Sequence, residues 1–247
     1  MIPKVIHYCW FGGNPLPPLA EKCIASWKKY LPDYEIKEWN ESNFDVNVIP
    51  YTEQAYKAKK YAFVSDYARF WILYKYGGIY FDTDVEVIRP MDDIIAAGPF
   101  MGCENNGSDM SVAHVAPGLG LGVNPGLGLY KEMLDFYATL SFRRKDGSLD
   151  KTTIVTYTTN ILCKHGLKNS SEVQSVAGVN IYPVDYMCPQ DYVTGEINIT
   201  DRTVSIHHYS GSWKTPKDKL KSRIASLLGD RVTGVLIKLR RHIKIDF

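Results

Sequence analysis

The sequence predicts an α/β fold in which helices cover a central sheet. Three observations lead to this fold class. The first forty residues give a strand, a helix and a second strand, an order that is typical of α/β layers. The central third has a long helical pattern followed by a strand that contains two acidic residues. The composition, with 45% hydrophobic and 23% charged residues among 247, is that of an ordinary globular protein.

The N-terminal segment supplies the first three elements. Residues 3–10 mix β-branched and aromatic side chains before Phe11-Gly12-Gly13, which predicts a buried strand that ends in a loop. A helix begins at Pro17-Pro18, carries its apolar residues on one stripe and is closed by Pro32. Residues 34–39 predict the second strand.

The central segment is the most informative part of the chain. Residues 52–76 have helical spacing, and Gly77-Gly78 supplies the left-handed stop that favours a helix C-terminus. Residues 79–88 then predict one strand. Asp82 and Asp84 come where this strand leaves the core, which is where open α/β sheets place their ligands.

The second half of the chain has weaker patterns. Residues 104–125 are rich in Gly, Asn and Ser and predict a long loop beside a functional site. Further elements are expected in four ranges: helices over 127–140 and 153–165, and strands over 179–184 and 203–208.

Several protein classes are excluded by composition. Charged residues interrupt every apolar stretch before the roughly 18 residues of a membrane span, and residues 1–13 lack the apolar run of a secretory signal. The five cysteines form no C-x-x-C pair, so we expect them in the core rather than in disulfides or a zinc site. A cytoplasmic protein is expected.

The charge is distributed unevenly. Residues 214–247 hold ten Lys and Arg against three acids, although the whole chain has a net charge of only +2. The prediction is a folded domain over 1–213 followed by a basic amphipathic tail over 214–247. The tail is expected either to pack on the domain or to lie on an anionic membrane surface. The acidic balance of the domain argues against nucleic-acid binding.

Three groups of residues could carry chemistry. Asp82 and Asp84 offer hard oxygen ligands that suit Mg²⁺ and Mn²⁺, although such pairs also occur on ordinary surfaces. Asp66 and Arg69 share one helix face, either as a simple ion pair or as a clamp for hydroxyl and phosphate groups. His207 and His208 point to opposite faces of a strand, so one could be buried while the other meets a metal.

Together these residues carry a resemblance to a known family. The block Tyr61-Ala62-x-x-Ser65-Asp66-x-x-Arg69, followed by residues 77–84 (GGIYFDTD), resembles the sugar-binding region of DXD-containing glycosyltransferases of family 32. It also resembles the catalytic domains of the large clostridial glucosylating toxins. Blocks at residues 2–12 and 207–213 are similar to the ends of the same family.

The resemblance implies a fold and a donor site. The fold would be GT-A, a Rossmann-like arrangement with a mixed sheet that binds a nucleotide sugar with Mn²⁺ or Mg²⁺. Trp10 would stack on the nucleobase. Asp66 and Arg69 would hold the hydroxyls of the donor sugar, with Arg69 also near the diphosphate, and Asp82 would contact the ribose and the sugar.

The resemblance also implies a metal site beside the leaving group. Asp84 would bind the metal directly with Asp82 nearby, and His207 or His208 would complete the site. Ser212 and Trp213 would close over the leaving phosphate.

The implied reaction is transfer of a hexose, with retention of anomeric configuration, to a glycan or lipid-linked glycan. A UDP-sugar is the favoured donor and GDP-mannose the second choice. The compact length resembles bacterial enzymes of capsule, exopolysaccharide or lipopolysaccharide synthesis, working in the cytoplasm or peripherally at the inner face of the membrane. Residues 149–162 are expected on the acceptor side. The pattern contains no obvious carboxylate nucleophile. The acceptor is therefore expected to attack the anomeric carbon on the same face from which the leaving group departs.

Two other classes compete with this interpretation. Asp82-Thr83-Asp84 also resembles the motif of haloacid-dehalogenase-type phosphatases, although that family places it near the start of its domain. A catalytically inactive protein that binds sugar nucleotides is the other alternative.

Overall fold

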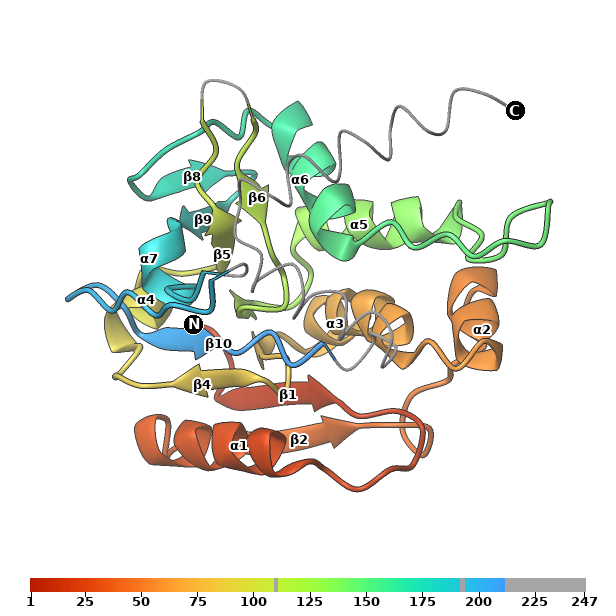
Figure 1. Cartoon of the computed structure of the whole chain (residues 1–247), viewed down its shortest axis with the longest axis horizontal. Helices are drawn as coiled ribbons and strands as arrows, with labels where there is room; N and C mark the ends of the chain where they lie inside the picture. The colour runs from red at the N-terminus through yellow and green to blue at the C-terminus, as the bar shows by residue number, and fades with distance from the viewer. Residues whose placement is uncertain (109–110, 192–193, 212–247) are drawn as a thin grey trace.

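The structure, a computed structural model, describes residues 1–108, 111–191 and 194–211. Its centre is an 8-stranded mixed sheet with the order β2-β1-β3-β7-β5-β9-β8, in which β6 pairs with β5. A 2-stranded sheet of β4 and β10 lies beside it. Helices pack on both sides of these strands (Figure 1). The α/β class with a mixed sheet, as the GT-A prediction requires, is confirmed.

The first elements lie where the sequence predicts them. Strand β1 (Val5–Cys9), helix α1 (Pro18–Tyr30) and strand β2 (Glu35–Trp39) form in order, and β1 pairs in parallel with both β2 and β3. Trp27 fastens α1 to this layer, because its indole N–H donates to the carbonyl of Val85 at 2.8 Å.

The helix predicted over residues 52–76 is two helices, α2 (Pro50–Lys57) and α3 (Tyr61–Tyr76). The break lies at Lys59, whose φ of 55° is incompatible with a right-handed helix. Helix α3 ends at Gly77 as predicted, with a φ of 65°. The break gives α3 its own direction and places its first turns against the site described below.

The strand predicted over residues 79–88 is also two strands. Strand β3 (Gly78–Tyr80) belongs to the large sheet, whereas β4 (Val85–Val87) pairs with β10 (Ser205–His207). Between them Val85 donates its N–H to the carbonyl of Asp82 at 3.1 Å. The two predicted acidic residues therefore sit in a turn where the chain passes from one sheet to the other.

The loop predicted over residues 104–125 contains strands. Strand β5 (Phe100–Asn105) pairs with β6 (His114–Val115) and with β7 (Leu121–Val123). Glycines here allow close packing: a Cβ on Gly122 would lie 2.0 Å from the ring of Phe100. The glycines that suggested a loop thus allow neighbouring strands to pack closely.

The remaining elements complete the layers. Helices α5 (Gly128–Ala138) and α6 (Ile154–Lys164) and strand β9 (Val179–Tyr182) agree with the predicted ranges. The short elements α4 (Asp92–Ala96), β8 (Gln174–Val176) and α7 (Val184–Met187) were not predicted. Cys163 is exposed, which corrects its placement in the core, whereas the other four cysteines are buried.

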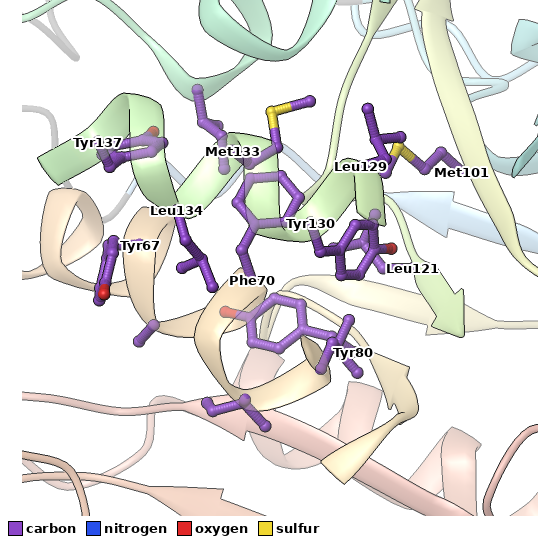
Figure 2. Packing of buried hydrophobic residues seen from close by; sticks show 14 of the residues in the cluster. Tyr67, Phe70, Tyr80, Met101, Leu121, Leu129, Tyr130, Met133, Leu134 and Tyr137 are labelled. Atoms are coloured by element: carbon purple, nitrogen blue, oxygen red, sulfur yellow. The ribbon is translucent and has the colours of Figure 1, made fainter. Parts of the chain in front are cut away.

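The core divides between the two faces of the large sheet. One cluster joins α3 and α5 to one face, and the other joins α1 to the opposite face. Figure 2 shows Tyr67 and Phe70 of α3 meeting Tyr130, Leu134 and Tyr137 of α5 in the first cluster. No helix in the described ranges is long and apolar enough to cross a membrane. Ser212, Trp213 and the tail over 214–247 lie outside the described residues.

Candidate functional site

A single cavity of about 770 Å³ gathers most of the predicted site residues. Its walls include Trp10 after β1, Asp66 and Arg69 on α3, Asp82 and Asp84 in the β3–β4 turn, and His207 on β10. Trp10 and His207, which are 197 positions apart in the sequence, therefore line the same cavity. Its volume is in the range of sites for nucleotide-sized ligands.

Arg69 is the centre of the charged network. Its Nη2 lies 2.9 Å from Asp66 Oδ1 and 3.2 Å from Asp82 Oδ1, and its Nη1 lies 3.3 Å from Asp82 Oδ2. Tyr80 Oη donates to Asp82 Oδ1 at 3.0 Å. The Arg69 side chain is only 3% exposed, so the guanidinium is fixed by its partners rather than by water.

Burial shapes the charges of this network. It raises the pKa of Asp66 to about 7; the charge of Arg69 partly offsets this rise, and the charge of Asp82 adds to it. The carboxylates beside Arg69 hold its pKa above the ordinary range, so the guanidinium stays charged. Arg69 thus supplies a fixed guanidinium that can donate to phosphate or hydroxyl oxygens, and its two carboxylate partners can accept from ligand hydroxyls.

Asp84 and His207 form a second cluster. His207 Nε2 lies 3.2 Å from Asp84 Oδ1, and the Ser210 N–H donates to Asp84 Oδ2 at 2.8 Å. These contacts hold the pKa of Asp84 well below its usual range, although burial opposes them. Asp84 in turn raises the pKa of His207 to about 10 against the effect of burial.

Asp82, Asp84 and His207 offer a metal site. One ligand atom from each residue lies within 4.8 Å of the others. Two carboxylate oxygens and one imidazole nitrogen, whose proton a bound cation would displace, form a donor set that suits Mn²⁺ and Mg²⁺. The residues therefore fit the cation that the sequence implies.

His208 lies apart from this cluster. The antiparallel register pairs His207 with Val85, and the next residue turns to the other side. His208 Nε2 lies 2.7 Å from Glu86 Oε2, to which Lys22 Nζ also donates at 2.7 Å. The structure thus brings His207 to the carboxylates and places His208 in a separate ion-pair network.

Trp10 is one of the residues that line the cavity. Its indole N–H donates to the carbonyl of Asn14 at 2.6 Å, and its ring is partly exposed. A partly exposed indole in the cavity wall is the residue type that could stack on a planar group.

The structure adds three residues that the sequence did not single out. Gly118 touches the network so closely that a Cβ there would lie 2.2 Å from Asp82 Oδ2. Glu104 and His114 line the same cavity. The glycine-rich character of residues 117–122 was a usable signal for Gly118, whereas Glu104 and His114 depend on strand pairing. Thr153, Ile154 and Val155, within the region expected on the acceptor side, also line the cavity.

Comparison with known proteins agrees with the geometry. Residues 17–101 match the family model for the glycosyltransferase sugar-binding region containing DXD motif. Inositol phosphoceramide mannosyltransferase 3 of Schizosaccharomyces pombe is 36% identical over 101 residues, which are 38% of this chain and 27% of that protein. Inositol phosphoceramide mannosyltransferase 1 of the same organism is 28% identical over 111 residues, 40% of this chain and 33% of that protein.

The chain thus spans about a quarter to a third of the length of these curated relatives. Among solved structures, the PaToxG glycosyltransferase aligns with a TM-score of 0.49 and 18% identity, covering 66% of this chain and 69% of that one. The family match contains Asp66, Arg69, Asp82 and Asp84. The predicted resemblance to DXD-containing glycosyltransferases is confirmed over these residues.

Proposed function

We propose that this chain, which carries the sugar-binding region of the DXD-containing glycosyltransferases, is a metal-dependent hexosyltransferase that uses a nucleotide-sugar donor. One observation carries the proposal. Asp82 belongs to both clusters of the cavity, because it pairs with Arg69 and offers a ligand atom beside those of Asp84 and His207. A diphosphate held there would meet a cation site on one side and a guanidinium on the other.

The residue types suit departure of a nucleoside diphosphate. Asp82, Asp84 and His207 would hold Mn²⁺ or Mg²⁺, which would supply positive charge beside the leaving phosphate. Arg69 offers a fixed positive charge in the same buried setting, where it stabilises developing negative charge without reorganisation. Asp66, at 2.9 Å from Arg69, would accept hydrogen bonds from sugar hydroxyls, and Trp10 would stack on the base.

The finer assignments follow the sequence-based expectations. The favoured donor is a UDP-hexose, and the mannosyltransferase names of the relatives support including GDP-mannose in any test. The acceptor is a glycan or lipid-linked glycan of capsule, exopolysaccharide or lipopolysaccharide synthesis. Transfer proceeds with retention, in the cytoplasm or at the inner face of the membrane.

The test is hydrolysis of a panel of UDP- and GDP-sugars by the purified protein, with Mn²⁺, Mg²⁺ or EDTA. We expect release of the nucleoside diphosphate from one donor, abolished by EDTA and reduced at least about 100-fold in Asp84→Asn. Asp135→Asn is the matched control, because Asp135 is an exposed residue of α5 that pairs with Lys131.

The other outcomes identify the competing classes. Phosphate release from a simple phosphoester, without cleavage of any nucleotide sugar, would replace the proposal with the phosphatase. Tight donor binding without turnover, in the presence of glycan acceptors as well, would indicate the inactive binding protein. Once an acceptor is known, the anomeric proton coupling of the product measures retention, and an inverted product contradicts it.

The membrane role of the tail is a separate proposal. Its ten basic residues would attract anionic lipid at about 1 kcal/mol each near the surface. We expect the full chain to sediment with vesicles that contain phosphatidylglycerol, and a chain truncated after Asp230 to bind them more weakly. Equal binding by the two chains would contradict this proposal.

A further inference from the structure

Strand β5 contains a β-bulge at the edge of the cavity. In its pairing with β6, Cys103 lies opposite Val115 and Asn105 lies opposite His114. Two residue steps on β5 thus match one step on β6, and Glu104 is the extra residue. A bulge of this kind re-aims a side chain and interrupts the regular alternation of a strand.

Glu104 and His114 meet across this bulge. The Glu104 Oε1 lies 4.0 Å from His114 Nδ1, and both residues line the cavity. The carboxylate forms no hydrogen bond within the described ranges, although its side chain is only 27% exposed. Burial raises its pKa above the usual range for a glutamate, and His114 and His207 partly offset this rise. An under-bonded, partly buried carboxylate is a good hydrogen-bond acceptor for a ligand hydroxyl.

Glu104 belongs to a different wall of the cavity from Trp10, Asp66 and Arg69, although His207 of the metal cluster is near enough to affect its pKa. Trp10 follows β1, and Asp66 and Arg69 lie on α3, whereas Glu104 and His114 come from β5 and β6, which lie near α6 (Figure 1). Helix α6 packs on β6, where Thr159 Oγ1 accepts the Val115 N–H at 3.0 Å. The first residues of α6, Ile154 and Val155, line the cavity as well. The walls from β5, β6 and α6 supply side chains that the donor assignments do not use.

Resting on the proposed function, we propose that Glu104, aimed by the β5 bulge and paired with His114, binds the attacking hydroxyl of the acceptor and takes its proton. The hydroxyl oxygen forms a bond to the anomeric carbon of the donor sugar. The bond from that carbon to the β-phosphate oxygen breaks, and its electron pair leaves with the nucleoside diphosphate. The hydroxyl proton passes to a Glu104 carboxylate oxygen and reaches solvent after the product departs.

The test needs no identified glycan, because water is the acceptor in donor hydrolysis. The variant is Glu104→Gln, which keeps the size of the side chain and removes its basicity. We expect kcat to fall at least about 100-fold, the range of a lost acid-base group, with KM for the donor and Kd for the nucleoside diphosphate in Mn²⁺ changed less than about twofold. Glu132→Gln is the matched control, because Glu132 forms an exposed pair with His165 at 2.7 Å away from the cavity.

A second variant distinguishes chemistry from folding. In Glu104→Ala, added formate can enter the space left by the side chain, and we expect it to restore part of the lost kcat. Unfolding would be insensitive to formate. Mass spectrometry of the wild-type protein with its donor should show no hexose attached to the peptide that contains Glu104.

Four results would overturn the inference. If Glu104→Gln had the same kcat as the wild type, the carboxylate would be dispensable. A rise in KM and Kd together would move Glu104 to the donor side, and a covalent hexose on Glu104 would make it a nucleophile. A wild-type protein that neither binds nor cleaves any donor would overturn the proposed function and this inference with it, whereas the first three results would leave the proposed function intact.

Discussion

The orientations of the charged side chains in this site are fixed by close contacts with their neighbours. Arg69, 3% exposed, holds Asp66 and Asp82 at once, and Asp82 accepts a further bond from Tyr80. On the remaining side, the Asp82 N–H donates to the carbonyl of Gly118 at 3.2 Å. The orientation of Asp82, which both clusters share, therefore depends on the absence of a side chain at Gly118.

This dependence predicts the effect of Gly118→Ala. A Cβ there would lie 2.2 Å from Asp82 Oδ2, so the carboxylate must turn away from Arg69 and from Asp84. We expect Mn²⁺ binding, measured by calorimetry, to weaken at least about tenfold, as for a displaced ligand-orienting contact, while the circular dichroism spectrum is unchanged. Gly128→Ala, where a Cβ meets nothing within 4 Å, should bind Mn²⁺ as the wild type does.

Among the helices and strands, the sequence predicted those elements whose ends are set by nearby residues. The proline-opened helix α1 and the strands β1 and β2 follow from spacing and turn residues, and α3 ends at Gly77 as predicted. The break before α3 carried no such signal, because Lys59 adopts a φ of 55° without a glycine or proline to mark it. Tertiary packing decided that position.

Site residues that lie close together in the sequence could be predicted. Those whose direction depends on how two strands pair could not. The spacing of Asp66 and Arg69 is enough to place them on one helix face. The choice between His207 and His208 depends on the register of β10 against β4, which one sequence does not show. Glu104 was missed for a related reason, since its direction follows from a bulge in a pair of strands that the sequence predicted as a loop.

Gly77→Ala tests the junction between α3 and β3. Gly77 has a φ of 65° and a ψ of −163°, a region that is essentially restricted to glycine and costs other residues about 1–3 kcal/mol. A Cβ would also lie 2.7 Å from Pro125 Cδ. We expect the free energy of unfolding in urea to fall by at least about 2 kcal/mol. An unchanged midpoint of unfolding would show that the junction relaxes without cost.

For the whole molecule, stability as a function of pH depends on groups buried far from solvent. His7 on β1 accepts the Trp39 indole N–H at Nδ1 at 3.0 Å, and its Nε2 lies 3.0 Å from the carbonyl of Gly77. These contacts tie β1 to β2 and to the end of α3, and they require the neutral ring with its proton on Nε2. Burial accordingly lowers the pKa of His7 to about 4.

The sign of the pH effect follows from proton uptake. Between pH 6.5 and about 4 the unfolded chain binds a proton at His7 that the folded chain does not, so stability falls as the pH falls through this window. At about 1.4 kcal/mol per pH unit, the loss reaches about 3 kcal/mol and stops once the folded ring is also protonated. Asp66 acts in the opposite direction, because its raised pKa lets the folded state take up a proton first.

The two effects are separated by comparing wild type with His7→Gln, whose amide can accept from Trp39 and donate to Gly77. Urea unfolding at pH 7.0 and pH 4.5 should show a smaller loss of stability on acidification in the variant, by about 2–3 kcal/mol, because only the His7 contribution has been removed. His165→Gln, a change on the surface beside α6, controls for the loss of a histidine. Parallel curves for wild type and His7→Gln would mean that the folded protein accommodates a charged ring at His7, which its two fixed hydrogen bonds argue against.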